Sequence, residues 1–320
     1  MAACSRRRSF LEKIQCCDDL SELVKNVKSG LIQLYPIVSK HDIDLIKVIG
    51  SGCFSNIYLA NLKTGKGDKK IVLKSPTNCT KDSTIIEDVR LECTIMYALN
   101  HPNIIRSYGI YVIHDNLGVN YCISMDLMDG NLRDLIIKYN QLSRMSSIQK
   151  DVILNSISKQ IANAMNYLHL NKIIHCDLKL ANILYNSSYV VKICDFGLST
   201  LNCPGEKKRV GTPLYMAPEV IRSLNQGRCA FNEKIDVYSY GILLWEIYTQ
   251  KEAFLGYNDE NAFIQKVIRD RELYNVNPLE FEQSFSLDLK NLLHRSWKMN
   301  PADRPSFEQI LQSPMFLTKS

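Results

Sequence analysis

The spacing of hydrophobic positions changes along the chain. Apolar residues recur at helical intervals from Leu20 to Leu34, after a capping-box-like pair formed by Asp19 and Glu22. This pattern predicts an amphipathic helix within residues 1–41. We favour a helix that packs on the domain that follows, over a helix that binds a regulatory partner.

From residue 42 the pattern changes to short runs rich in β-branched residues. These runs predict strands, with a turn at Gly65–Asp68 and a helix from about 85 to 99. The predicted strands cover residues 43–49, 57–60, 71–74, 104–113 and 121–125.

After Gly130 the spacing is mostly helical. Residues 151–169 have one apolar face, and residues 236–249 are apolar nearly all round, which predicts a helix buried through the centre of a domain. The pattern therefore predicts an α+β protein in which a small β-rich lobe precedes a larger helical lobe.

Composition narrows the class of protein without identifying it. The chain has 320 residues, 46% of them hydrophobic, and a net charge of +6, which we interpret as solubility rather than nucleic-acid binding. Its 11 cysteines include no C-x-x-C pair, so the spacing of a metal finger is absent. Scattered cysteines of this kind are typical of a reducing compartment, which favours a cytoplasmic location. No apolar run is long enough to span a membrane, and no secretory signal follows the basic N-terminus.

A glycine-containing turn and a lysine suggest a phosphate-binding region. Gly50-Ser51-Gly52 lies between the first two predicted strands, where glycines let backbone N–H groups approach phosphates. Lys74 ends the third strand, and Glu92 on the following predicted helix is the candidate that would hold it in position. Glu87 is the alternative partner.

Two polar motifs carry the strongest chemical signal. His175-Cys176-Asp177-Leu178-Lys179 continues to Asn182, and Asp195-Phe196-Gly197 follows after a predicted hairpin around residues 186–188. The set supplies a carboxylate to orient a hydroxyl, a lysine for phosphate oxygens, and oxygen ligands for Mg²⁺.

Taken in order along the chain, these motifs resemble those of the eukaryotic-type protein kinases. The resemblance covers about residues 42–317 and implies the bilobal protein kinase fold, with an N-lobe at 42–128 and a C-lobe at 129–317. Lys179, and Gly211-Thr212-Pro213 before Tyr215, resemble serine/threonine kinases, on the tyrosine-kinase-like or Mos-type branch. The resemblance to protein kinases also implies ATP and Mg²⁺ as cofactors and a protein as substrate.

The resemblance also assigns roles to residues. Asp177 and Lys179 would be catalytic, and Asn182 and Asp195 would hold the metal ion. Met125 would be the gatekeeper, followed by a hinge whose backbone reads the adenine. The nucleotide would contact Ile49, Gly50, Ser51, Gly52, Ile57, Val72, Lys74, Glu92, Met125, Asp126, Met128 and Leu184.

Three further elements follow from the resemblance. Glu219 would form a buried pair with Arg304, Asp236 would support the catalytic loop, and Thr212 would contact that loop. Where the family commonly has an arginine that binds an activating phosphate, this chain has Cys176, and residues 201–211 contain no serine, threonine or tyrosine. We therefore predict a kinase that does not need activation-loop phosphorylation.

Two alternatives remain at this stage. A pseudokinase scaffold is disfavoured, because Lys74, Glu92, Asp177, Asn182 and Asp195 are all retained. A dual-specificity kinase would use the same residues and would differ in the hydroxyl groups that it accepts.

Overall fold

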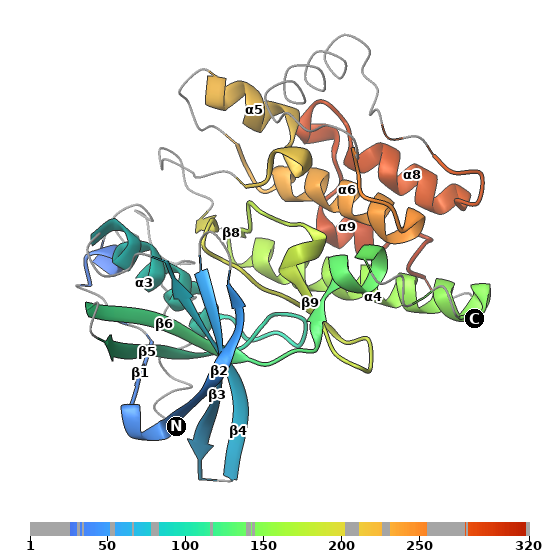
Figure 1. Ribbon diagram of the computed structural model, residues 1–320. Helices are drawn as coiled ribbons and strands as arrows, with labels where there is room; N and C mark the ends of the chain where they lie inside the picture. Colours follow the sequence, from blue (N-terminus) through green and yellow to red (C-terminus); the bar gives the residue numbers. More distant parts are fainter. Residues whose placement is uncertain are drawn as a thin grey trace. The chain divides into compact units, whose positions relative to one another are not determined.

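The computed structural model describes most of the chain, in two compact units, Met1–Met128 and Asp129–Ser320 (Figure 1). Each unit is described by itself. The described residues are 26–30, 33, 35–51, 55–65, 67–77, 83–115, 118–138, 142, 145–201, 211–225, 231–254, 279 and 281–317. Gly52, Cys53 and most of the expected N-terminal helix lie outside them.

The first unit contains a six-stranded sheet in the order β1-β5-β6-β4-β3-β2 and the helix α3. All neighbouring strands pair antiparallel except β1, which lies parallel to β5. The elements are β1 (Ile37–Val38), η1 (Lys40–Asp42), β2 (Ile43–Ser51), β3 (Ser55–Thr64), β4 (Gly67–Pro76), α3 (Ser83–Ala98), β5 (Ser107–Asp115) and β6 (Gly118–Asp126). The five predicted strands and the predicted helix are all present, with shifted ends.

Alternation along the strands builds the core of this unit. On β4, Ile71 and Leu73 are fully buried, whereas the residues between and after them, Val72 and Lys74, are partly exposed. Since side chains alternate between the two faces of a strand, Ile71 and Leu73 fill the core on one face. Val72 and Lys74 lie on the other.

The predicted N-terminal helix is wrong at its C-terminal end. Residues 26–28 are helical, but Gly30 has φ +82°, which an α-helix cannot continue through, and a strand begins at Ile37. The described helix therefore ends before Gly30, and Leu31 and Leu34 lie outside the described residues. Val27 is fully buried, so residues 26–28 pack within the first unit.

The second unit is mainly helical, with short strands near its catalytic motifs (Figure 1). Its elements are β7 (Gly130–Asn131), the π-helix η2 (Asp134–Lys138), α4 (Ser147–Leu170), β8 (Ile173–Ile174), η4 (Leu180–Asn182), β9 (Ile183–Tyr185), β10 (Val191–Ile193), β11 (Thr200–Leu201), η5 (Pro213–Tyr215), α5 (Pro218–Asn225), α6 (Lys234–Thr249), α8 (Leu287–Ser296), η6 (Pro301–Asp303) and α9 (Phe307–Leu311).

Local sequence features explain where α4 begins and where α6 ends. Ser146 and Gln149 form a capping box that starts α4. Helix α6 is buried along nearly its whole length, as predicted, and ends at Gln250 in the left-handed conformation. Among the described residues, no helix is both long and apolar enough to cross a membrane.

A buried ion pair joins the end of the chain to α5. Arg304 is 2% exposed, and its guanidinium donates to the Glu219 carboxylate at 2.6 and 2.8 Å. It also donates to the carbonyls of Lys234 and Lys298. Because these bonds satisfy the desolvated charge, the pair is structural, which confirms the predicted pairing.

Candidate active site

Asp177 lies at the centre of a hydrogen-bonded group in the second unit. One carboxylate oxygen accepts from the Thr212 N–H and hydroxyl, both at 2.9 Å. The other accepts from the Asn182 amide at 2.9 Å and lies 2.8 Å from Lys179 Nζ. Lys179 Nζ also donates to the Thr212 hydroxyl at 2.7 Å. These contacts fix the Asp177 carboxylate in one orientation.

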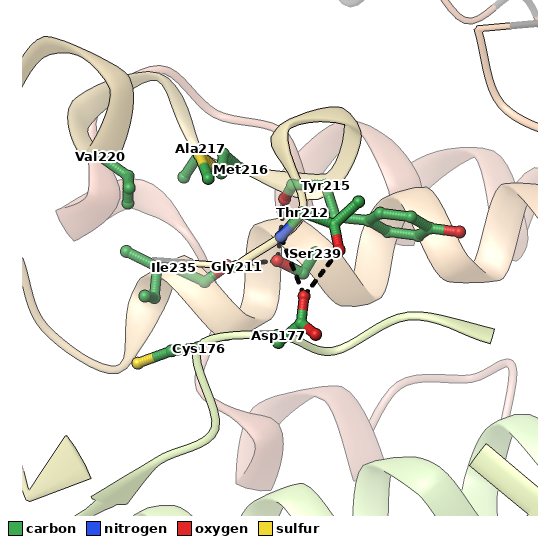
Figure 2. Close-up of a pocket in the computed structure, with 10 residues that line it drawn as sticks. All are labelled: Cys176, Asp177, Gly211, Thr212, Tyr215, Met216, Ala217, Val220, Ile235 and Ser239. Atoms are coloured by element: carbon green, nitrogen blue, oxygen red, sulfur yellow. Dashed lines mark hydrogen bonds between the residues drawn. The ribbon is translucent and has the colours of Figure 1, made fainter. Parts of the chain in front are cut away.

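Gly211 allows the backbone before Thr212 to lie close to the Asp177 carboxylate. A Cβ atom at this position would lie 2.4 Å from Asp177 Oδ1 and 2.5 Å from the Cys176 carbonyl. No larger residue fits there without moving the backbone. Figure 2 shows Gly211 and Thr212 beside Asp177 in a small pocket, with apolar side chains of Val220 and Ile235 nearby.

Asp236 supports the loop from the buried helix α6. It is fully buried, and its carboxylate accepts from the backbone N–H groups of His175 and Cys176 at 2.9 and 3.0 Å. His169 Nε2 lies 2.9 Å from the same carboxylate. The predicted support by Asp236 is therefore present, whereas no pattern in the sequence indicated the contact of His169. The backbone of Cys176 is in the left-handed region, with φ +66°, and in this conformation the Asp236 carboxylate accepts from both N–H groups.

The hairpin of β9 and β10 brings the two motifs together. Ile183 pairs with Ile193, and the Cys194 N–H donates to the Asn182 carbonyl at 2.9 Å. Asn182 therefore lies opposite the residue that precedes Asp195. His175, which is fully buried, reaches the Cys194 carbonyl through Nε2 at 3.1 Å and accepts from the Asp177 N–H at 3.3 Å.

Asn182 and Asp195 suit a hard cation. An amide oxygen and a carboxylate are ligand types that Mg²⁺ accepts, and Mg²⁺ commonly takes only one or two protein ligands together with phosphates. The Asn182 amide nitrogen is directed at Asp177, which leaves its oxygen as the ligand atom. The donor set therefore fits a magnesium site.

In the first unit, four of the predicted nucleotide-contacting residues share one face of the sheet. Ile57 pairs with Lys74 across β3 and β4. Val72 pairs with Met125 across β4 and β6. Because paired residues point to the same face, these four side chains form one surface, and Met125 is its most buried member at 7% exposed.

Lys74 and Glu92 form an ion pair on this face. Lys74 Nζ lies 2.8 Å from Glu92 Oε1, and both side chains are mostly buried. The pair links β4 to α3, and it selects Glu92 over the alternative, Glu87. A partly buried pair of this kind fixes a lysine where a phosphate could meet it.

The phosphate loop is only partly described. Gly50 and Ser51 lie at the end of β2, and Gly52 is outside the described residues. The strand shifts register between Val48 and Gly50, so Ile49 lies in a bulge and is 44% exposed.

The side chain of Asp126, at the predicted hinge, is engaged within the sheet. Its carboxylate accepts from Lys69 at 2.8 Å and from Tyr108 at 2.5 Å. This arrangement agrees with a hinge that presents its backbone to a ligand. Met128 is the last residue of the first unit, and Leu184 lies half-buried on β9 of the second.

A carboxylate whose contacts the sequence did not indicate lies beside Tyr215, which lines the pocket next to Asp177. Glu246 on α6 accepts from the Tyr215 hydroxyl at 2.6 Å and from the Ala253 N–H at 3.0 Å. Burial raises the pKa of Glu246 to about 7 and the pKa of Tyr215 well above its usual value. No local spacing could have revealed this contact, since the two residues lie on separate elements.

Known proteins are similar to this chain along most of its length. The chain is 33% identical over 286 residues to "Dual specificity protein kinase shkA" of Dictyostelium discoideum, covering 86% of this chain and 49% of that protein. It is 29% identical over 284 residues to "Serine/threonine-protein kinase CTR1" of Arabidopsis thaliana, covering 87% and 32%. The chain thus spans about half or less of these relatives.

The family description "Protein kinase domain" matches residues 43–316. This range contains every motif discussed above, from Gly50 to Arg304. The chain therefore belongs to the protein kinase family.

Proposed function

We propose that residues 42–317 form an ATP- and Mg²⁺-dependent protein kinase domain that phosphorylates serine and threonine. Its N-lobe would span residues 42–128 and its C-lobe 129–317. The observation that carries the proposal is the Asp177 carboxylate, oriented by Lys179, Asn182 and Thr212.

The geometry supports a division of roles. Asp177 would orient the substrate hydroxyl and accept its proton as the γ-phosphoryl group of ATP passes to that oxygen and ADP leaves. Lys179, within 2.8 Å of the carboxylate, would offset the charge of the transferring group. Lys74, held by Glu92, would bind the α and β phosphates.

Mg²⁺ would be held by Asn182 and Asp195. When bound, it would neutralise charge on the ATP phosphates. The protein's own part is to present an amide oxygen just before β9 and a carboxylate just after β10, two strands that pair at Ile183 and Ile193.

The Lys179–Thr212 hydrogen bond favours serine and threonine. Both residues belong to the motifs that resemble serine/threonine kinases. Dual specificity is the second candidate, because several similar proteins carry that description in their names.

The test uses the full chain with Mg-ATP and peptide arrays that contain serine, threonine or tyrosine. Replacing Asp177 with asparagine should lower phosphorylation by about 10²- to 10⁴-fold with little change in thermal stability. Asp303→Asn, at an exposed position, is the matched control. Wild-type activity no higher than that of Asp177→Asn would overturn the proposal, and comparable tyrosine labelling would replace it with dual specificity.

We also propose that activity does not require phosphorylation of the activation segment. Residues 201–211 lack hydroxyl side chains. Of the hydroxyl residues beside this segment, Ser199 and Thr200 are buried and Thr212 is bonded to Asp177 and Lys179. Phosphatase-treated protein should keep its activity, and loss of most activity would contradict this part of the proposal.

A further inference from the structure

The segment that precedes the kinase domain is built into the first unit. Val27 is fully buried and Tyr35 is 4% exposed. Residues Ile37 and Val38 form β1, which extends the sheet by pairing with Ile110 and Tyr111 of β5. The segment is therefore part of the folded unit.

The sheet is shaped to accept this segment. The Ile110 N–H donates to the Pro36 carbonyl at 3.0 Å. Gly109 has φ +123°, and a Cβ atom there would lie 2.2 Å from the Pro36 carbonyl oxygen. Because only glycine tolerates both conditions, the sheet edge is specific for this contact.

The same segment also contacts α3 through Arg90. Arg90 Nη1 donates to the Lys28 carbonyl at 3.1 Å, where the short helix of residues 26–28 ends. Gly30 follows with φ +82°, and a Cβ atom there would lie 3.0 Å from Arg90 Nη1. A cation near a helix C-terminus and its carbonyls is a favourable arrangement.

Tyr35 contacts the same side of α3. Its side chain interacts electrostatically with Arg90 and Cys93, and burial raises its pKa to about 12. Arg90 and Cys93 are three residues apart, so they lie on one face of the helix. Glu92 points elsewhere, toward Lys74. The segment therefore contacts the face of α3 that carries Arg90 and Cys93, and not the face that carries Glu92.

We propose that residues 26–38 set the position of α3, and with it the Lys74–Glu92 pair, with Arg90 as the positioning residue. This inference rests on the proposed kinase function for its effect on activity. A rotation or shift of α3 would move Glu92 away from Lys74. The segment limits this movement, because it contacts α3 through Arg90 and pairs with β5 at the edge of the sheet.

The test replaces Arg90 in the full chain. Arg90→Ala should lower kcat/KM for ATP by about tenfold, as expected for loss of a charged hydrogen bond. Arg90→Lys, which can still donate to the Lys28 carbonyl, should recover part of this loss. Lys63→Ala removes a cation from an exposed pair of the same unit and should change nothing.

A double-mutant cycle separates positioning from general stability. In a Glu92→Gln background, Arg90→Ala should lower kcat/KM by less than about twofold, because the pair that it positions is already broken. An equal effect of Arg90→Ala in both backgrounds would overturn the inference.

Hydrogen exchange gives a readout that does not depend on activity. Backbone amides of α3 should exchange faster in Arg90→Ala than in wild type, and should not change in Lys63→Ala. Unchanged exchange in Arg90→Ala would overturn the inference. If the wild-type chain has no kinase activity, the proposed function fails, and the exchange result alone decides whether the segment positions α3.

Discussion

The candidate site residues of the two units are held in different ways. In the second unit, the loop that carries Asp177 is bonded to Asp236, a fully buried residue of the helix that runs through that unit. In the first unit, Glu92 lies on α3, which packs against β5 and β6 and is contacted by a segment that precedes the domain. The catalytic loop is fixed by the core, whereas the Lys74–Glu92 pair depends on where one helix lies.

This difference indicates where the protein could be controlled. A loop anchored to a buried carboxylate cannot move without exposing unpaired N–H groups, which is costly. A helix that packs against the sheet through its side chains can shift without leaving buried N–H groups unpaired, and therefore at a smaller cost. The absence of hydroxyl groups from residues 201–211 agrees with control outside the activation segment.

The largest expected effect is the loss of the anchor in the second unit. Asp236→Ala would leave the N–H groups of His175 and Cys176 without their acceptor in a buried region. We expect activity to fall by more than about 100-fold and the free energy of unfolding to fall by roughly 2–6 kcal/mol, at about 1–3 kcal/mol for each unsatisfied group. Kinase assays and urea unfolding measure both.

Asp236→Asn is a milder substitution, since its amide oxygen can still accept a hydrogen bond from one of the two N–H groups. Its activity and stability should lie between those of wild type and Asp236→Ala. Wild-type activity in both variants would show that the catalytic loop does not depend on α6.

The second-largest expected effect follows from breaking the Lys74–Glu92 pair of the first unit. Glu92→Gln keeps the size of the side chain but removes its charge, so Lys74 loses its ionic partner. We expect kcat/KM for ATP to fall by roughly 10- to 100-fold, with a smaller change in unfolding free energy than for Asp236→Ala. Steady-state kinetics and urea unfolding compare the two.

Glu87→Gln is the matched control, because it makes the same chemical change on the same helix. It should leave kcat/KM for ATP near the wild-type value. Equal losses in both variants would remove the special role that we give to Glu92.

The smallest effect concerns Glu246 and appears only as a dependence on pH. Its pKa is raised from 4.5 to about 7 by burial, so the folded protein binds more protons than the unfolded chain between these values. The stability that it contributes is therefore fully present below about pH 4.5 and is lost as the pH rises to about 7. Urea unfolding at several pH values measures this slope.

Glu246→Gln cannot ionise and should flatten the slope in that range. Glu308→Gln, at an exposed position, should keep the wild-type slope. An unchanged slope in Glu246→Gln would mean that this carboxylate titrates normally in the folded protein.

Much of the fold could be read from local patterns. Alternation along β4 and the apolar surface of α6 are properties of short segments, and the elements predicted from residue 42 onward appear in the structure. The predicted N-terminal helix was too long, because apolar spacing alone does not show where a helix ends. Gly30, within the predicted span, was the signal of that end.

Parts of the candidate site came from motif order and resemblance rather than from spacing. The pairing of Glu219 with Arg304 joins residues 85 apart, and no local pattern predicts it. The packing roles of His169, Gly211 and Glu246 escaped prediction for the same reason, since these roles depend on what lies beside each residue.

The sequence by itself determined the chemistry of this protein. It supplied the residue types, the motif order and the alternation of β-rich and helical segments, all of which are encoded over short distances. The tertiary structure decided which distant groups meet: Asp236 with the catalytic loop, Glu92 rather than Glu87 with Lys74, and Arg90 with the preceding segment. Such contacts arise from packing and backbone geometry, which bring together residues that are far apart in the chain.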